Sequence, residues 1–250
     1  MNCVFVRRRG HGGKPIPLID LFSDISFTAY DGRGYSSTGY VVLDWSAVQS
    51  NQLYYILSFC NGYLGVWKVK NGIPQSNPVL WSSTTDGGIY VETSNNTITG
   101  VYYNDTGYKT GADHTSSTAG ASKEYTAMLF LVTFPGYKES DIDASFKKST
   151  VTRFWGNNTS AGSSSASAYR TSDKTNDVYL STTDNGNSAG TTFGFDAWKV
   201  SGDTYEYITG VGRQYAAGVT VVSGLNYLAH RSNSGLTAGT HRGSLIGLKL

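Results

Sequence analysis

Few side chains in this sequence combine the types and the spacing that catalysis requires. Asp105-Thr106-Gly107 has the letters of an aspartic-protease motif, but that mechanism needs two carboxylates sharing a proton, and no second Asp-Thr-Gly or Asp-Ser-Gly occurs. His230 and His241 flank a glycine-rich segment, yet no nearby cysteine or acidic residue supplies the third ligand of a zinc site. We therefore predict a protein that is not an enzyme and that uses neither a metal ion nor a cofactor.

Two further acidic motifs are interpreted as ordinary surface features. Asp141 and Asp143 fall on a predicted helix, where we expect both carboxylates to be solvated. Asp184-Asn185-Gly186-Asn187 resembles part of a calcium loop, but it lacks the glutamate that completes such a loop. Neither motif predicts a cation site.

Residue types suited to binding a sugar gather in two places. Aromatic rings offer flat faces to sugar rings, while amides, carboxylates and hydroxyls bond the sugar hydroxyls. The first cluster is Tyr102, Tyr103, Asn104, Asp105 and Tyr108, and the second is Trp155, Asn157, Asn158 and Tyr169. These clusters are the predicted ligand-binding residues, although aromatic residues in strands also serve as core or cross-strand pairs.

A short basic arm precedes a nearly neutral body. Arg7, Arg8, Arg9 and Lys14 carry four of the positive charges, and the net charge of the whole chain is only +2. The body therefore has no broad positive field for nucleic acid, and we expect the arm to anchor the chain to an acidic partner surface. A solvated, unattached terminus is the alternative. Glycines and prolines interrupt the apolar residues after the arginines, so neither a secretion signal nor membrane insertion is expected.

The composition of the body predicts an all-β fold. Charged residues are only 15%, and the chain has 30 glycines and 18 tyrosines. Asn61-Gly62, between the apolar runs Leu53–Cys60 and Tyr63–Val69, predicts a hairpin turn. A second hairpin is predicted over Ile89–Tyr103, and the apolar run Met128–Phe134 indicates a strand that is covered on both faces. Only Lys138–Lys148 is predicted to be helical, with Ser140 as its cap and Ile142 and Phe146 on one face.

Several segments of the first half resemble segments of the second half in the same order. The matches are Gly65–Val69 with Asp196–Val200, Ile98–Tyr103 with Val222–Tyr227, Thr118–Gly120 with Thr237–Gly239, and Thr126–Phe134 with Ser244–Leu250. They predict two tandem antiparallel β-sandwich modules, jelly-roll-like, over residues 20–135 and 149–250. Residues 1–19 would form the arm and 136–148 a linker that includes the helix. A single sandwich with recurrent strand chemistry is the alternative.

Three features together resemble bacteriophage virion structural proteins of the tail-fibre or head-fibre type. They are the arm MNCVFVRRRGHGGKP before a body rich in Gly, Ser, Thr, Asn and Tyr, the apparent tandem sandwich, and the buried-type strand Ser244–Leu250 at the C-terminus. The resemblance implies a protein made in the host cytoplasm without a signal peptide and located in the virion. It also implies a homo-oligomer, often a trimer, whose arm docks on other virion proteins and whose β domains bind host-surface glycans.

Two other functions stay open at this point. A free carbohydrate-binding module or lectin would explain the tyrosine-rich, polar composition equally well. A glycan-degrading hydrolase would need a pair of carboxylates at a fixed separation; the acidic residues are few, and no motif in the sequence supports this function.

Overall fold

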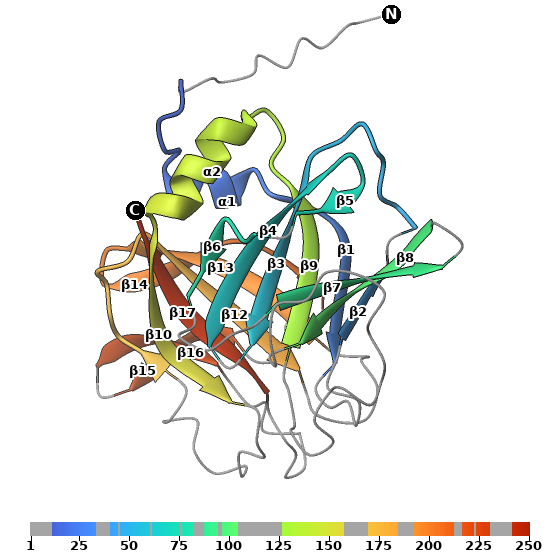
Figure 1. Ribbon diagram of the computed structural model, residues 1–250. Helices are drawn as coiled ribbons and strands as arrows, with labels where there is room; N and C mark the ends of the chain where they lie inside the picture. The colour runs from blue at the N-terminus through green and yellow to red at the C-terminus, as the bar shows by residue number, and fades with distance from the viewer. Residues whose placement is uncertain are drawn as a thin grey trace, which may run out of the picture.

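The computed structural model describes a chain that is mostly antiparallel β-sheet, which confirms the prediction of an all-β protein (Figure 1). The described residues are 12–33, 41–44, 46–60, 62–75, 77–82, 88–94, 97–104, 127–157, 170–184, 193–212, 217–222, 224–230 and 242–250. They include two short helices, α1 (Leu18–Ser23) and α2 (Glu139–Lys148). Neither helix has the length and apolar character needed to cross a membrane.

The first half of the chain forms one large and one small sheet. The strands of the large sheet are β1 (Ser26–Arg33), β3 (Tyr54–Cys60), β4 (Tyr63–Lys70), β5 (Ile73–Pro74), β6 (Leu80–Trp81) and β9 (Ala127–Thr133). Their order is β1-β9-β3-β4-β5, and β6 also pairs with β4. The small sheet has the order β2-β8-β7, from β2 (Val41–Asp44), β7 (Gly88–Ser94) and β8 (Thr97–Asn104). Both predicted hairpins are present, as β3–β4 and β7–β8.

The second half repeats this strand order. Its large sheet contains β10 (Thr150–Asn157), β12 (Val178–Asp184), β13 (Phe193–Ser201), β14 (Thr204–Gly212) and β17 (Arg242–Lys249) in the order β10-β17-β12-β13-β14. Its small sheet has the order β11-β16-β15, from β11 (Arg170–Thr171), β15 (Ala217–Val222) and β16 (Leu225–His230). In each half, the last strand lies between the first and third strands of that half: β9 lies between β1 and β3, and β17 lies between β10 and β12. In each half, a helix precedes the first strand.

The best sequence match between the halves also occupies equivalent register. Gly65–Val69 lies in β4 and Asp196–Val200 lies in β13, the fourth strand of each half. The first residue of each segment pairs with a buried serine, Ser58 in β3 or Ser181 in β12. The match therefore describes the same place in two similar sheets.

A second match connects equivalent strands in the wrong register. Ile98–Tyr103 lies within β8, whereas Val222–Tyr227 spans the turn between β15 and β16. In the first half, the equivalent strands β7 and β8 end at Ser94 and begin at Thr97, so the junction between them precedes the matched segment. The glycines that suggested this match therefore have different roles. The match of Thr118–Gly120 with Thr237–Gly239 lies outside the described residues.

Among the described residues, three hydrophobic clusters lie between these layers. One cluster fills the space between the outer face of the first large sheet and Leu43 of β2, and a second fills the equivalent space in the second half beneath Leu228 of β16. The third and largest cluster contains side chains of both large sheets and both helices. Figure 1 shows α1 and α2 together at one end of the two large sheets. The two halves are thus joined by a common core.

Strand β9 serves two clusters at once. Met128, Phe130 and Val132 belong to the shared core, while Leu129 and Leu131 face the outer cluster of the first half. Alternate side chains of a strand point to opposite faces, so an unbroken apolar run suits a strand covered on both sides. The prediction for this segment is confirmed.

Both helices depart from the expectations in detail. α2 is present and buries Ile142 and Phe146 as predicted, but Lys138 is at its N-cap and no side chain caps it, so the prediction for Ser140 is wrong. The prediction of a single helix is also wrong, because α1 buries Leu18, Leu21 and Phe22 in the shared core. Core packing stabilises a helix of only six residues that is too short to show a periodic pattern.

Candidate functional site

The predicted sugar-binding residues begin on two different sheets. Tyr102, Tyr103 and Asn104 are the last residues of β8 in a small sheet, whereas Trp155 and Asn157 are at the end of β10 in a large sheet. The other predicted ligand-binding residues, Asp105, Tyr108, Asn158 and Tyr169, lie outside the described residues, as do Arg7, Arg8 and Arg9 of the arm. Lys14 is described and is exposed to solvent.

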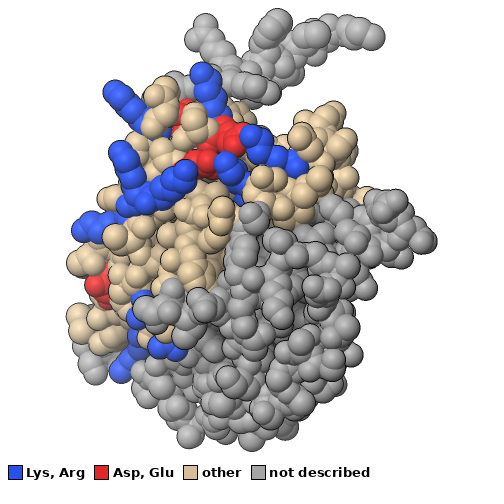
Figure 2. Space-filling view, viewed as in Figure 1, with Lys and Arg blue, Asp and Glu red and all other residues tan. Residues whose placement is uncertain are grey.

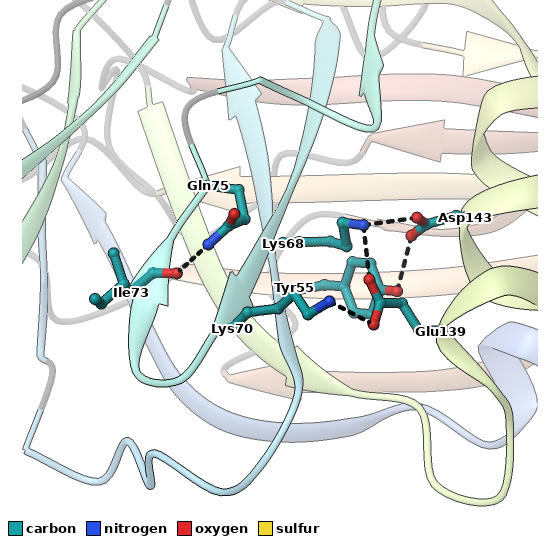
Figure 3. Close-up of polar contacts among 7 residues, drawn as sticks. All are labelled: Tyr55, Lys68, Lys70, Ile73, Gln75, Glu139 and Asp143. Atoms are coloured by element: carbon teal, nitrogen blue, oxygen red, sulfur yellow. Dashed lines mark hydrogen bonds and ion pairs between the residues drawn. The ribbon is translucent and has the colours of Figure 1, made fainter.

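The described structure instead brings five charged or hydroxyl side chains together between α2 and the first large sheet (Figure 3). We call this set the α2 network; its members are Tyr55, Lys68, Lys70, Glu139 and Asp143. The hydroxyl of Tyr55 donates to Oδ1 of Asp143 at 3.0 Å. The ammonium of Lys68 donates to Oδ2 of Asp143 and to Oε1 of Glu139, both at 2.8 Å. Lys70 adds an ion pair to Oε2 of Glu139 at 3.1 Å.

The expectation that Asp141 and Asp143 are solvated is wrong. Both residues are buried because α2 lies with this face against the rest of the fold. Asp143 belongs to the α2 network, while Oδ1 of Asp141 accepts the backbone N–H of Gly13 at 2.6 Å. Each buried carboxylate thus accepts a hydrogen bond that offsets the cost of its burial.

Hydrogen bonds in the α2 network favour the charged forms of Lys68 and Glu139. Burial alone would lower the pKa of Lys68, but hydrogen bonds to Asp143 and Glu139 outweigh it and raise that pKa. Burial would raise the pKa of Glu139, yet hydrogen bonds from Lys68 and Lys70 hold it below its usual value. Burial, assisted by the Asp143 charge, raises the pKa of Tyr55 far above its usual range. These three groups therefore do not exchange protons near neutral pH, as a general acid or base must.

This arrangement predicts a loss of stability in acid. A carboxyl whose pKa is lowered by folding stabilises the fold fully above its ordinary pKa, which is 4.5 for Glu139. That contribution disappears as the pH falls through the lower pKa of the folded state. We expect urea unfolding to show falling stability below this pH, with a shallower decline in Glu139→Gln. An identical pH slope in the variant would contradict the role of Glu139.

Two hollows flank the α2 network. A hollow of about 390 Å³ is lined by Tyr55 and Glu139, and one of about 250 Å³ is lined by Lys68 and Asp143. Figure 2 shows lysine and arginine side chains around α2 on this face, with acidic side chains among them. Both carboxylates of the network are paired with lysine side chains, so the network stabilises the packing of α2 against the sheet.

A third hollow, of about 350 Å³, lies in the second half where three turns meet. Its lining residues are Ser172, Lys174, Asp203, Gly224, Leu225 and Asn226. Sequence analysis did not predict a binding site here, because the lining residues come from three separate segments of the chain with no shared motif. Its geometry includes a lysine ammonium 3.8 Å from the centroid of the Tyr205 ring.

Asp173 fixes the loop that carries this lysine. Its carboxylate accepts hydrogen bonds from the hydroxyl of Tyr179 at 2.7 Å and from the backbone N–H of Thr175 at 2.9 Å. Burial would raise the pKa of Asp173, but the hydrogen bonds from Tyr179 and Thr175 outweigh it and lower that pKa. Burial also raises the pKa of Tyr179 to about 12. The loop is therefore held by groups that keep one protonation state around neutral pH.

No family model, curated protein or solved structure matches this chain. Within the described residues, no group of three or more His, Cys, Asp or Glu side chains is arranged to hold a metal ion. The function therefore has to be inferred from the arrangement of the chain's own residues.

Proposed function

We propose that this chain is a non-enzymatic structural protein of a bacteriophage virion, of the tail-fibre or head-decoration kind, that binds host-surface glycans. The supporting observation is that the N-terminal segment joins the body at its helical end. Gly13 bonds Asp141 of α2, and the backbone N–H of Ile16 donates to Oγ of Ser145 at 2.7 Å. The arm, with Arg7, Arg8 and Arg9, would therefore extend from this end toward an acidic surface of the particle.

The opposite end of the sheets is the one proposed to face the host. Strand β10 begins directly after α2 and runs eight residues to Asn157, so its far end is about 25 Å from the helix. Trp155 and Asn157 of the second predicted cluster are at that far end. Attachment at the helical end would leave this far end free to contact the host surface, as in a homo-oligomeric, for example trimeric, virion component.

The fold is consistent with two tandem β-sandwich modules produced by duplication. The matching strand order of the halves supports this proposal, as does the separate hydrophobic cluster between the large and small sheet of each half. Because the two large sheets share a core, the two modules would fold and unfold together. A single sandwich with recurrent strand chemistry accounts less directly for the repeated strand order.

The state of the acidic residues favours a binding protein over a glycan-degrading hydrolase. Glu139 and Asp143 both accept hydrogen bonds from Lys68, and hydrogen bonds from Lys68 and Lys70 hold the pKa of Glu139 below its usual value. A hydrolase needs one protonated carboxyl to donate to the leaving group. Glu139 is therefore unsuited to be the general acid of that mechanism.

Detection of the protein in purified particles tests this proposal. Antibody against the chain should follow intact particles through a density gradient. The isolated protein should bind host-surface polysaccharide without reducing its viscosity. Absence from particles, together with glycan binding by the free protein, would favour a lectin and overturn the virion assignment.

Two truncations should separate attachment from folding. Deletion of residues 1–11 keeps the Gly13 and Ile16 contacts, so we expect unchanged thermal unfolding but loss of particle attachment, which in the full chain weakens as salt rises. Deletion of residues 1–16 also removes buried Ile16 and its bonds to Ser145. It should cost about 2–4 kcal/mol of stability. Normal attachment after the shorter deletion would contradict the anchoring role of the arm.

A further inference from the structure

The third hollow has the dimensions of a small-ligand site. Its volume of about 350 Å³ falls within the range of roughly 300–1,000 Å³ that is typical of such sites. A Cβ added at Gly224 would meet no atom within 4 Å, so this side of the hollow is open. The site is therefore accessible without movement of the surrounding turns.

Lys174 is the cationic group of this hollow, and its bonding is weak. Its ammonium lies over the Tyr205 ring, and its hydrogen bonds to the carbonyl oxygens of Ser172 and Asn226 are both 3.5 Å long. These lengths are at the outer limit of a hydrogen bond, and no carboxylate of the described residues lies within 4.0 Å of the ammonium. An ammonium has three donors, so it retains capacity for an incoming anion.

The other lining groups suit the hydroxyls of a ligand better than they suit a doubly charged anion. Asp203 contributes a carboxylate that accepts hydrogen bonds, and Asn226 contributes an amide, which donates to the carbonyl oxygen of Asp203 at 3.4 Å. Leu225 is 57% exposed and offers an apolar surface beside them. Asp203 would repel a phosphate dianion more strongly than a single carboxylate, and a sugar that carries one carboxylate also presents hydroxyls and C–H groups to the other lining residues.

We infer that this hollow binds a saccharide unit that carries a carboxylate. The ammonium of Lys174 bonds the carboxylate, Asp203 and Asn226 bond hydroxyls, and Leu225 contacts the C–H face of the ring. This inference rests on the proposed glycan-binding function. Asp203 follows β13 at the end of the large sheet where β10 begins, whereas Trp155 and Asn157 are at the other end of β10, so the inferred site adds a second point of contact with the glycan.

Calorimetric titration with trigalacturonate, and with its uncharged methyl ester, tests the inference. We expect the ester to bind the wild-type protein at least about tenfold more weakly than the acid. Lys174→Met should weaken acid binding by a similar factor. Lys199→Met is the matched control, since Lys199 is a half-buried lysine of the same half that pairs with Glu206 at 3.2 Å. Circular dichroism verifies that both variants are folded.

Each alternative result overturns the assignment. Equal weakening by Lys199→Met would show general attraction to a basic surface, and equal binding of acid and ester would show that the carboxylate is not recognised. Lack of binding to the folded wild-type protein at millimolar trigalacturonate would also overturn it. Presence of the protein in particles is measured independently, so the virion assignment can stand when this site fails.

Discussion

Replacing Phe195 by alanine is expected to lower the free energy of unfolding by about 3–5 kcal/mol, the cost of removing a fully buried aromatic ring. Phe195 comes from the second half, and its ring packs against four rings from the first half. Their centroids lie at 6.4 Å for Phe22, 5.4 Å for Phe27, 5.7 Å for Phe59 and 5.4 Å for Phe130. Because the cavity opens in the core that both halves share, both should lose stability together. Urea unfolding followed by tryptophan fluorescence and by circular dichroism should show one coincident transition at lower urea.

Phe154→Ala is the matched control for this experiment. Phe154 is half-buried, lies on the outer side of the second half and stacks on Tyr179 with centroids 5.8 Å apart. Its removal should cost less, about 1–2 kcal/mol, because part of the ring is already exposed to water. Two separate transitions, of which Phe195→Ala displaces only one, would show that the halves fold independently and would contradict a common core.

The elements of the fold were predictable wherever local chemistry specifies them. Asn61-Gly62 predicted the hairpin of β3 and β4, and Gly62 has φ of 81°, which glycine adopts without strain. The apolar run of β9 indicated burial on both faces. The order of the strands could not be predicted, because it depends on pairings between residues far apart in the sequence. α1 was missed for a related reason, since its stability comes from the core and not from its own six residues.

The α2 network was beyond sequence analysis for geometric reasons. Tyr55 and Asp143 are 88 residues apart, and their contact depends on how α2 is rotated against the sheet. Lys68 was visible as part of the repeated Trp-Lys-Val letters, but its counterpart Lys199 pairs with Glu206 of the neighbouring strand. The same letters in the two halves thus have different partners, and only the packing of α2 explains the difference. The hollow around Lys174 likewise joins three loops that share no motif.

Replacing Asp143 by alanine is expected to cost about 2–4 kcal/mol, the second large effect. The Asp143 side chain is only 12% exposed, and it accepts hydrogen bonds from both Tyr55 and Lys68. Its loss leaves the hydroxyl of Tyr55 buried without this acceptor, and an unmet buried donor costs more than the bond contributed. Lys68 would retain Glu139, which limits the loss. The change should appear as a lower urea midpoint at pH 7.

A double-mutant cycle isolates the contact that carries this prediction. In a Tyr55→Phe background there is no hydroxyl that loses its acceptor. Asp143→Ala should therefore lower the free energy of unfolding by about 1 kcal/mol less than it does in the wild type. Lys70→Met is the control for loss of charge, since Lys70 is 48% exposed and bonds only Glu139 of the network. Exposed ion pairs contribute little, so it should change stability by at most about 1 kcal/mol. If Asp143→Ala costs no more than Lys70→Met, and its cost is the same in both backgrounds, then packing of Ile142 and Phe146 holds α2 in place and the network does not.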